Sequence, residues 1–423
     1  MFSQSFIAVF IFILTYVFIV SEKIDRTAIS FFGACLMILF GIVTQEEAIH
    51  YIDFNTIGLL IGMMIVVSIL KSTGLFQYIA IKSAKIAKGE PLRIIVIFSI
   101  VTAVLSAFLD NVTTVLLIAP VTLVITDTLK VNPIPFLVPQ ILSSNIGGTA
   151  TLVGDPPNIM IGSSTNLSFL DFIFNTGPIS LIILIVTIFS FKFIYKDKLH
   201  VTDDVKQKVF SFDEKLAIKD KKLLVKSLTI LLLTVLGFLT HERFGLESSS
   251  VALIGASIML LVSRSKVEEV FHDIEWPTIF FFVFLFILVG GLEKVGIIDK
   301  LAYFITSSTK NNLFLSTILI LWTSAIASAF LDNIPFVATM IPLIKKIALL
   351  SSTDITPLWW ALSLGACLGG NGSLIGASAN VIVAGMLKKH NNEISFIDYL
   401  KIGFPLMIVS IILSTIYLIL FYL

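Results

Sequence analysis

Three acidic residues lie within long apolar stretches of the sequence, where a charge is costly to bury. Asp110 and Asp332 are each followed by an asparagine, Asn111 and Asn333, and Asp155 is followed by two prolines. A carboxylate in hydrocarbon costs at least a few kcal/mol, so such residues are functional candidates by default. A carboxylate can hold Na⁺ or a proton, and an asparagine amide oxygen suits Na⁺. The sequence therefore predicts H⁺ or Na⁺ binding, with Na⁺ at Asn111 and Asn333.

Each of these aspartates also has a structural interpretation, as the cap of a helix. Aspartate is a good N-cap, and the asparagine beside it stabilises turns. A serine would cap equally well without burying a charge, so for Asp110 and Asp332 we favour the functional interpretation. Capping and ion binding are also compatible, because a helical hairpin exposes free carbonyl and N–H groups at its tip.

Small and polar residues form a second pair of motifs, NIGGTATLVGDPPN at 145–158 and LGGNGSLIGASAN at 368–380. Glycines, hydroxyl residues and prolines at this depth predict a helix that unwinds and restarts, lining a cavity. A glycine-rich packing surface is the alternative, but it leaves Asp155 and Asn158 unexplained. The candidate ion- or substrate-binding residues are Asp110, Asn111, Thr113, Gly147, Gly148, Thr149, Thr151, Asp155, Asn158, Asp332, Asn333, Gly369, Gly370, Asn371, Ser373 and Asn380.

The sequence repeats itself. The hexapeptide Ser-Ala-Phe-Leu-Asp-Asn occurs at 106–111 and again at 328–333, so the two copies are 222 residues apart. The same offset pairs Asn158 with Asn380, and it needs no insertion from about residue 27 to that point. Such self-similarity indicates two homologous halves.

One deep carboxylate has no counterpart in the repeat. Asp155 corresponds to Ala377 in the second half, so the two halves differ in charge at this point. A strictly two-fold symmetric site is therefore excluded. Asp155 either adds a ligand to the first-half ion site, takes up a transported proton, or caps the restarted helix.

Composition places the chain in a membrane. Hydrophobic residues make up 57% of the chain and charged residues 13%, whereas soluble domains have about 25% charged residues. The lipid bilayer is therefore an expected partner. The net charge of +1 argues against a nucleic-acid partner. The two cysteines, Cys35 and Cys367, carry no disulfide or metal signature.

The apolar segments predict an all-α polytopic membrane protein. Those of the first half are 2–20, 28–43, 54–70, 92–129, 134–165 and 177–195. The fourth is about twice the length that a span needs and is broken by Asp110 and Asn111, so we expect a re-entrant helical hairpin. Each half then crosses five times, and an odd number inverts the second half. If two full spans replaced the hairpin, the number of crossings in each half would still be odd. The orientation of the second half therefore does not distinguish a hairpin from two spans.

The halves are expected at 1–195 and 223–423, each a transmembrane inverted repeat with a hairpin and a broken helix. The segment 196–222 between them is charged, and we favour a plain solvated tether over a short amphipathic helix. In this topology 23 of the 29 Lys and Arg residues lie on the side of this linker. The positive-inside rule makes the linker cytoplasmic and places both termini outside, in the cell (inner) membrane.

Two of these stretches together resemble a known family. SAFLDNVTTVLLIAPV followed by NIGGTATLVGDPPNIMI is similar to the ion transporter superfamily, in the branch of the arsenite permeases (ArsB), citrate–metal transporters (CitM), NhaD-type antiporters and the P protein. The resemblance covers essentially the whole chain. It implies a homodimer in which a mobile transport domain moves against a scaffold domain by an elevator mechanism.

The resemblance also suggests how the hairpin tips differ from those of relatives. In dicarboxylate transporters of the superfamily a Ser-Asn-Thr motif at each tip binds Na⁺. Here the matching positions hold Asp110-Asn111-Val112 and Asp332-Asn333-Ile334. The change from serine to aspartate adds negative charge where an anion would approach, which argues against a dicarboxylate substrate.

The leading functional prediction is a secondary transporter driven by H⁺ or Na⁺, with no other cofactor and no enzyme activity. Its cargo could be an arsenite-like neutral species, Na⁺, or an inorganic or organic anion. An anion channel is the alternative, although no Lys or Arg is expected near mid-membrane to line an anion pore. An intramembrane aspartyl protease is remote, because Val153-Gly154-Asp155 departs from the Gly-x-Gly-Asp motif.

Overall fold

The protein is helical throughout the part that the computed structural model describes, residues 3–21, 23–165, 167–196, 199, 201–310, 312–350 and 354–423. Helices account for 81% of the described residues, which contain no strand. Nine of the described helices are long and apolar enough to cross a membrane. The fold class predicted from the apolar segments, an all-α polytopic membrane protein, is confirmed.

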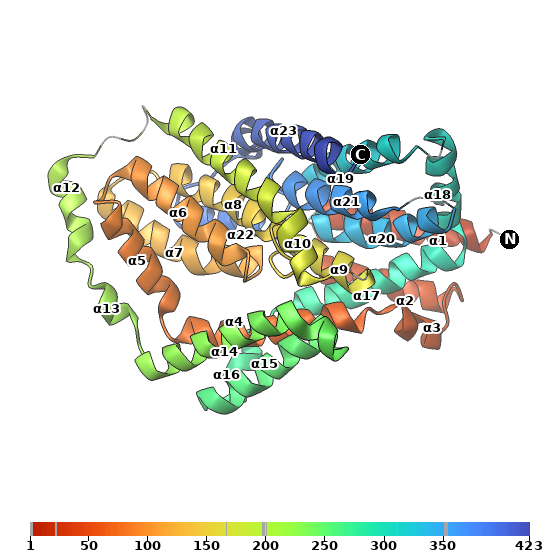
Figure 1. Ribbon diagram of the computed structural model, residues 1–423, viewed down its shortest axis with the longest axis horizontal. Coiled ribbons are helices and arrows are strands. Elements are labelled where there is room, and N and C mark those ends of the chain that lie inside the picture. The colour runs from red at the N-terminus through yellow and green to blue at the C-terminus, as the bar shows by residue number, and fades with distance from the viewer. Residues whose placement is uncertain are drawn as a thin grey trace.

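Helices of the first half follow the predicted apolar segments (Figure 1). They are α1 (Gln4–Ser21), α2 (Arg26–Leu39), α3 (Gln45–Tyr51), α4 (Phe54–Ser72), α5 (Leu75–Ile86), α6 (Pro91–Ser106), α7 (Asn111–Leu129), α8 (Ile134–Thr149), α9 (Pro156–Ser164), α10 (Phe169–Asn175) and α11 (Gly177–Tyr195). The linker contains α12 (Asp203–Gln207), the 3-10 helix η1 (Lys208–Ser211) and α13 (Glu214–Ala217).

The second half repeats this order. Its helices are α14 (Lys221–Thr240), the 3-10 helix η2 (His241–Phe244), α15 (Ser248–Ser263), α16 (Val267–His272), α17 (Trp276–Lys294), α18 (Ile297–Ser308), α19 (Leu313–Phe330), α20 (Asn333–Leu350), α21 (Thr356–Gly369), α22 (Ser378–Lys389) and α23 (Phe396–Phe421). The long helix α23 takes the place of α10 and α11 together.

Both predicted interruptions are present in each half. Helices α6 and α7 meet at a tip that ends in Asp110, and α19 and α20 meet at a tip that contains Asp332. Helix α8 stops at Thr149 and α9 restarts at Pro156, as the two prolines favour. The chain therefore has a hairpin and a broken helix in each half, and the entry of the hairpins from one membrane face stays a prediction.

Side-chain hydrogen bonds recur at the same offset as the sequence repeat. The hydroxyl of Ser106 donates to the carbonyl of Ser144 at 2.7 Å, and that of Ser328 donates to the carbonyl of Ala366 at 2.6 Å. Further pairs with this correspondence are Thr151 with Ala107 and Ser373 with Ala329. These bonds fasten the broken helix to the first hairpin arm of its own half.

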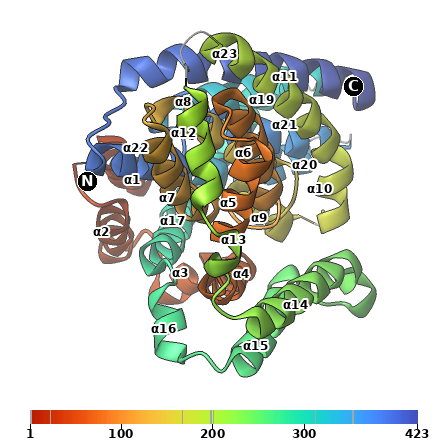
Figure 2. The same cartoon turned by 90° about the vertical axis from the view of Figure 1, so that its left-hand side faces the viewer.

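The helices form two layers, and Figure 2 shows α4 and α14–α16 below the bundle that contains α6–α8 and α20–α22. We call α1–α4 and α14–α17 the scaffold layer, and in it α2 packs on α17 and α4 on α15. We call α6–α9 and α19–α22 the hairpin layer, and α11 and α23 pack on its outer side. The two broken helices and both hairpin tips therefore belong to one layer.

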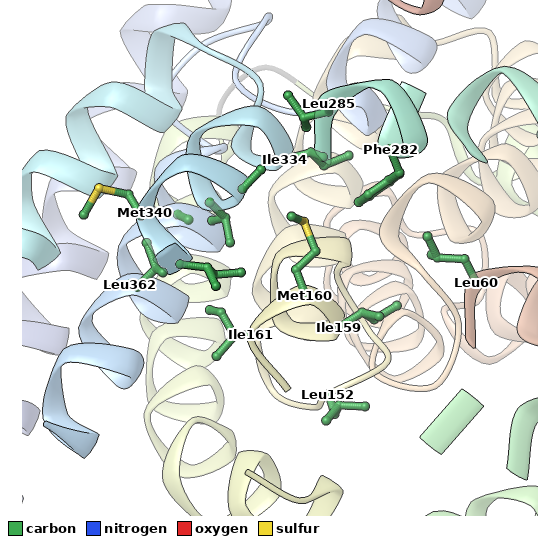
Figure 3. Close-up of a cluster of buried hydrophobic side chains, with 14 of the residues drawn as sticks. Leu60, Leu152, Ile159, Met160, Ile161, Phe282, Leu285, Ile334, Met340 and Leu362 are labelled. Carbon is green, nitrogen blue, oxygen red and sulfur yellow. The ribbon is translucent and has the colours of Figure 1, made fainter. Parts of the chain in front are cut away.

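The contact between the layers is largely apolar. Figure 3 shows Leu60 of α4 and Phe282 of α17 on the scaffold side, with Ile159 and Met160 of α9 and Ile334 of α20 opposite. All five side chains are buried. Polar contacts across the interface include Arg26 with Asp332, Asp53 with Ser163 and Tyr16 with Pro335. An apolar interface with few directional bonds can slide without leaving many polar groups unpaired.

The linker is not a plain tether, which corrects the preferred prediction. Val209 of η1 is fully buried, and Lys85 of α5 pairs with Glu214 of α13. Lys206 pairs with Glu90 at 2.9 Å. The linker thus packs along α5 and the base of the first hairpin, where Figure 1 places α12 and α13. Two of the charges that indicated solvation, Lys206 and Glu214, form ion pairs with residues outside the linker.

Candidate functional site

The two tip aspartates cap the helices that follow them. One carboxylate oxygen of Asp110 accepts the backbone N–H of Thr113 at 2.8 Å, and the other accepts the Thr113 hydroxyl. Asp332 accepts the backbone N–H of Ile334 at 3.1 Å. Both residues are partly buried, and the Asp332 side chain is only 12% exposed. One oxygen of each carboxylate therefore accepts the capping hydrogen bond. The hydrogen-bond partner of the second oxygen differs between Asp110 and Asp332.

A chain of buried asparagines joins the two halves. The amide nitrogen of Asn111 donates to Asn145 at 3.0 Å, and the Asn145 amide donates to Asn371 at 2.9 Å and to Asn380 at 3.1 Å. The side-chain oxygen of Asn111 is buried and has no hydrogen-bond partner in the described residues. An unpaired buried acceptor is costly unless something binds it. This oxygen therefore fits the Na⁺ ligand that the sequence predicts.

Asp155 occupies the N-cap position of α9, yet its side chain makes no capping hydrogen bond. The first two helical residues are Pro156 and Pro157, which have no N–H to offer. Instead, the Asn333 amide from the second hairpin tip donates to the Asp155 carboxylate at 3.2 Å. The side chain is completely buried, and no Lys, Arg or His of the described residues forms an ion pair with it. The cap interpretation of Asp155 thus has no bond to support it.

Asn158 and Asn380 hold the unwound backbone in place. The Asn158 amide nitrogen lies 2.9 Å from the carbonyl of Thr151 and 3.2 Å from that of Thr149. The Asn380 amide donates to the carbonyls of Gly370 at 2.7 Å and Ser373 at 2.8 Å. These carbonyls lost their helical partners at the break. The two asparagines therefore satisfy groups that would otherwise be unpaired at this depth.

The glycines of the motifs allow backbones to approach closely. A Cβ on Gly147 would lie 2.1 Å from the carbonyl oxygen of Ala103, and one on Gly369 would lie 2.6 Å from that of Ala325. Gly148 and Gly370 face the backbones of Gly154 and Gly376 in the same way. These positions fix the crossing of the broken helix over the hairpin arm.

Among the other predicted residues, Thr149 donates its hydroxyl to the carbonyl of Asn145 at 2.7 Å. The structure gathers the asparagines, Asp155 and both breaks at one centre of the hairpin layer. Asp110 and Asp332 are less buried, and Asp332 contacts Arg26 of the scaffold layer. The described residues hold no group of three or more His, Cys, Asp or Glu that could bind a metal ion. Oxygen donors of this kind suit an alkali cation or a proton.

Two residues were not among the predicted site residues. Asn145, the first residue of the NIGG motif, links the two halves through its side-chain amide. It corresponds to Cys367 in the repeat. Arg26, expected only in a loop, reaches the second hairpin tip and forms an ion pair with Asp332 at 2.8 Å. The corresponding residue of the second half is Ser248, which has no charge. This difference between the halves is the sequence feature that could have identified Arg26 as a site residue.

The scaffold layer presents opposite charges to the two tips. Arg26 meets the second tip, whereas Asp273 and Glu275 line a cavity of about 60 Å³ together with Thr113 of the first. Lys71 lines the same cavity and lies 3.6 Å from Asp273. The first tip therefore faces more carboxylate than ammonium, and the second faces a guanidinium.

Comparison with known proteins identifies the family. A family model described as a citrate transporter matches residues 16–365. The chain belongs to this citrate transporter family. An uncharacterized transporter of Mycobacterium tuberculosis is 43% identical over 98% of each chain, and a 46 kDa membrane protein of Mycobacterium leprae is 40% identical over 99% of each. Members of the citrate transporter family are membrane transporters, so the chain is a multi-pass transporter.

The wider resemblance predicted from the two motifs is also confirmed. The P protein of Sus scrofa is 34% identical over 95% of this chain and 58% of its own length. The YdaH transporter of Alcanivorax borkumensis has a similar structure, with a TM-score of 0.58 over 98% of this chain and 97% of that one. Its sequence identity of 11% supports the likeness of fold alone.

Proposed function

We propose that this citrate transporter family member is a secondary active transporter coupled to H⁺ or Na⁺. Its cargo is an ion or a small oxyanion or neutral oxyacid, such as Na⁺, an organic anion or an arsenite-like species. The hairpin layer carries the cargo past the scaffold layer in an elevator motion. No nucleotide-binding motif is present in the sequence, so an ion gradient is the energy source that its own residues can use.

Asp155 carries this proposal. It is a fully buried carboxylate that neither caps its helix nor pairs with a described basic side chain, and it lies beside the Asn333 amide at 3.2 Å. A fully buried carboxylate without a basic partner needs a bound cation or a proton to offset the cost of its burial. Binding and release of that charge is the event through which a gradient can drive transport.

The division into layers supports the motion. Both tips and both breaks lie in the hairpin layer, so that layer can move as a unit with its bound ion. The interface it would slide along is formed by apolar side chains such as Leu60, Phe282 and Met160. By analogy with the superfamily we also propose a homodimer.

The topology is part of the proposal. The linker would be cytoplasmic and both termini outside, in the cell (inner) membrane, because the linker side holds most of the Lys and Arg residues. The N-terminus and the linker helices α12 and α13 lie at opposite ends of the molecule in Figure 1, which is compatible with this orientation.

Flux assays with purified protein in proteoliposomes test the function. Na⁺, arsenite and citrate are each offered under an imposed pH gradient, an imposed Na⁺ gradient, or neither. We expect accumulation of one cargo beyond equilibrium under one gradient, and none in protein-free liposomes. Flux that only equilibrates would indicate a channel. An absence of gradient-driven movement for all three cargoes would contradict the proposal.

A further inference from the structure

A cavity of about 320 Å³ lies where the second hairpin tip meets the scaffold layer. Its polar walls are Asp25 and Arg26 at the start of α2, Asp332 of the tip and Ser378 at the start of α22. The remaining lining side chains are apolar, and half of them come from α1 and α22. This cavity is distinct from the buried asparagine centre, and nothing in the site described above explains its arginine.

Arg26 is bound on both sides of the layer interface. One guanidinium nitrogen lies 2.8 Å from the Asp332 carboxylate and 2.6 Å from the Ser378 hydroxyl. The other lies 3.4 Å from the hydroxyl of Thr278 in α17, and the guanidinium lies 5.0 Å from the ring centre of Phe281. The arginine is therefore anchored to the scaffold while its charge satisfies a carboxylate of the hairpin layer.

The oxygen atoms around the guanidinium resemble those expected around a small cation. The Ser378 hydroxyl donates to the same Asp332 oxygen at 2.8 Å, so hydroxyl and carboxylate form one compact acceptor group. The Asp332 side chain is only 12% exposed, so its charge needs a counter-charge. In this conformation Arg26 supplies it.

The first tip lacks this arrangement. The position that corresponds to Arg26 holds Ser248, and the position that corresponds to Ser378 holds Pro156. Asp110 is met by Thr113 and forms no ion pair with a basic side chain of the described residues. An arginine partner is therefore present at the second hairpin tip and absent from the first.

We propose that Arg26 acts as a tethered cation that fills a second alkali-cation site, formed by Asp332 and Ser378, whenever the layers stand as they do here. The proposal rests on the transporter function and adds a second site to it. When the hairpin layer moves, Asp332 and Ser378 travel with it and Arg26 stays with the scaffold. The vacated carboxylate then binds Na⁺, and return of the layer expels the ion because the guanidinium takes its place.

Thermal unfolding of the purified full-length protein tests this without any transport assay. Wild type and Arg26→Gln are compared at pH 8 in Na⁺ and in choline at equal ionic strength. We expect the midpoint of Arg26→Gln to rise with Na⁺ concentration more steeply than that of wild type, since a ligand stabilises the state that binds it. Arg26→Gln/Asp332→Asn should lose that gain. Arg26→Lys, which keeps the charge, and Arg93→Gln, which removes an exposed one, should respond as wild type.

Asp332→Asn alone gives a second test, which does not need Arg26→Gln to fold. Because Asp332→Asn lacks the carboxylate that binds Na⁺ when the layers move, its unfolding midpoint should rise less with Na⁺ than that of wild type. An undiminished Na⁺ response in Asp332→Asn, or no extra response in Arg26→Gln, would overturn the proposal. Both tests measure thermal stability and not transport. A wild-type protein without flux would therefore contradict the transporter function and leave the test of the Asp332 site unaffected.

Discussion

Asp155 is the residue at which ion coupling and helix capping make different predictions. Asp155→Ser keeps a capping oxygen and removes the charge. Since the structure gives Asp155 no capping bond, we expect the protein to fold normally but to lose transport or its dependence on the gradient. Proteoliposome flux under each gradient, with expression and thermal stability measured in parallel, checks this.

The matched control for that substitution is Asp204→Ser, which removes an exposed carboxylate from the linker. It should transport as the wild type does. If Asp155→Ser also transports at the wild-type rate with the wild-type gradient dependence, Asp155 is not the coupling residue, and only the two tip aspartates remain as candidates.

Sequence alone predicted the carboxylates and asparagines of the site better than their partners. Asp155, Asn158 and Asn333 stand out because a polar group in an apolar stretch has few structural explanations. Arg26 does not, because a basic residue beside an apolar segment is expected to lie at the interface. That its guanidinium reaches Asp332 depends on how the start of α2 lies against the tip between α19 and α20, and no local pattern encodes this contact between distant elements.

At the scale of elements, the crossing of α8 over α6 depends on Gly147. A Cβ there would lie 2.1 Å from the Ala103 carbonyl oxygen, so the helices must separate. We expect Gly147→Ala to lower the free energy of unfolding by about 1–3 kcal/mol, the range for overpacking. Gly385→Ala on α22 is the control, because its Cβ would meet no atom within 4 Å. It should be neutral or gain up to about 1 kcal/mol.

Denaturant unfolding in detergent compares the two glycine variants. The account requires that Gly147→Ala be clearly less stable than Gly385→Ala. Equal stability of the two variants would mean that α8 and α6 can separate at no cost, and that the glycine pairs have another role.

Docking of the linker is expected to depend on Glu214. Its hydrogen bond from Lys85 holds the pKa of Glu214 below the ordinary value, so the pair stabilises docking at pH values above that ordinary value and is lost as pH falls through the lowered one. We expect Glu214→Gln to speed amide hydrogen exchange in residues 203–217 at pH 7. The difference from wild type should shrink under acid conditions.

Glu269→Gln is the control for the linker, since Glu269 forms an exposed ion pair with Lys266 on a neighbouring helix turn. Its exchange in 203–217 should match the wild type. Unchanged exchange in Glu214→Gln at pH 7 would show that buried contacts such as Val209 hold the linker without the ion pair.

Element positions were largely predictable, and element contacts were not. The apolar segments 54–70 and 177–195 became α4 and α11 with ends within two residues, because a span has to be apolar along its length. The linker was harder, since its charges favour water and ion pairs alike. Whether the linker charges face water or form ion pairs depends on Lys85 and Glu90, which are far from the linker in sequence.

At the scale of the whole molecule, the orientation in the membrane can be tested with single cysteines. Cys35 is replaced by serine, and cysteine is introduced at Lys208, an exposed linker position, or after Leu423. We expect an impermeant thiol reagent to label the C-terminal site in intact cells and the Lys208 site only after lysis. Labelling of both from the same side would contradict the inverted arrangement of the halves.

The central claim is that the hairpin layer moves against the scaffold layer during transport. The hydroxyl of Ser163 on α9 donates to the carboxylate of Asp53 at the start of α4 at 2.7 Å, so cysteines at these positions can bridge the layers. The most direct measurement is flux by Ser163→Cys/Asp53→Cys without Cys35, before and after oxidation. We expect the reduced protein to transport, the oxidised protein to stop, and a reductant to restore flux, with each single variant insensitive to oxidation. Full flux in the cross-linked protein would contradict the account.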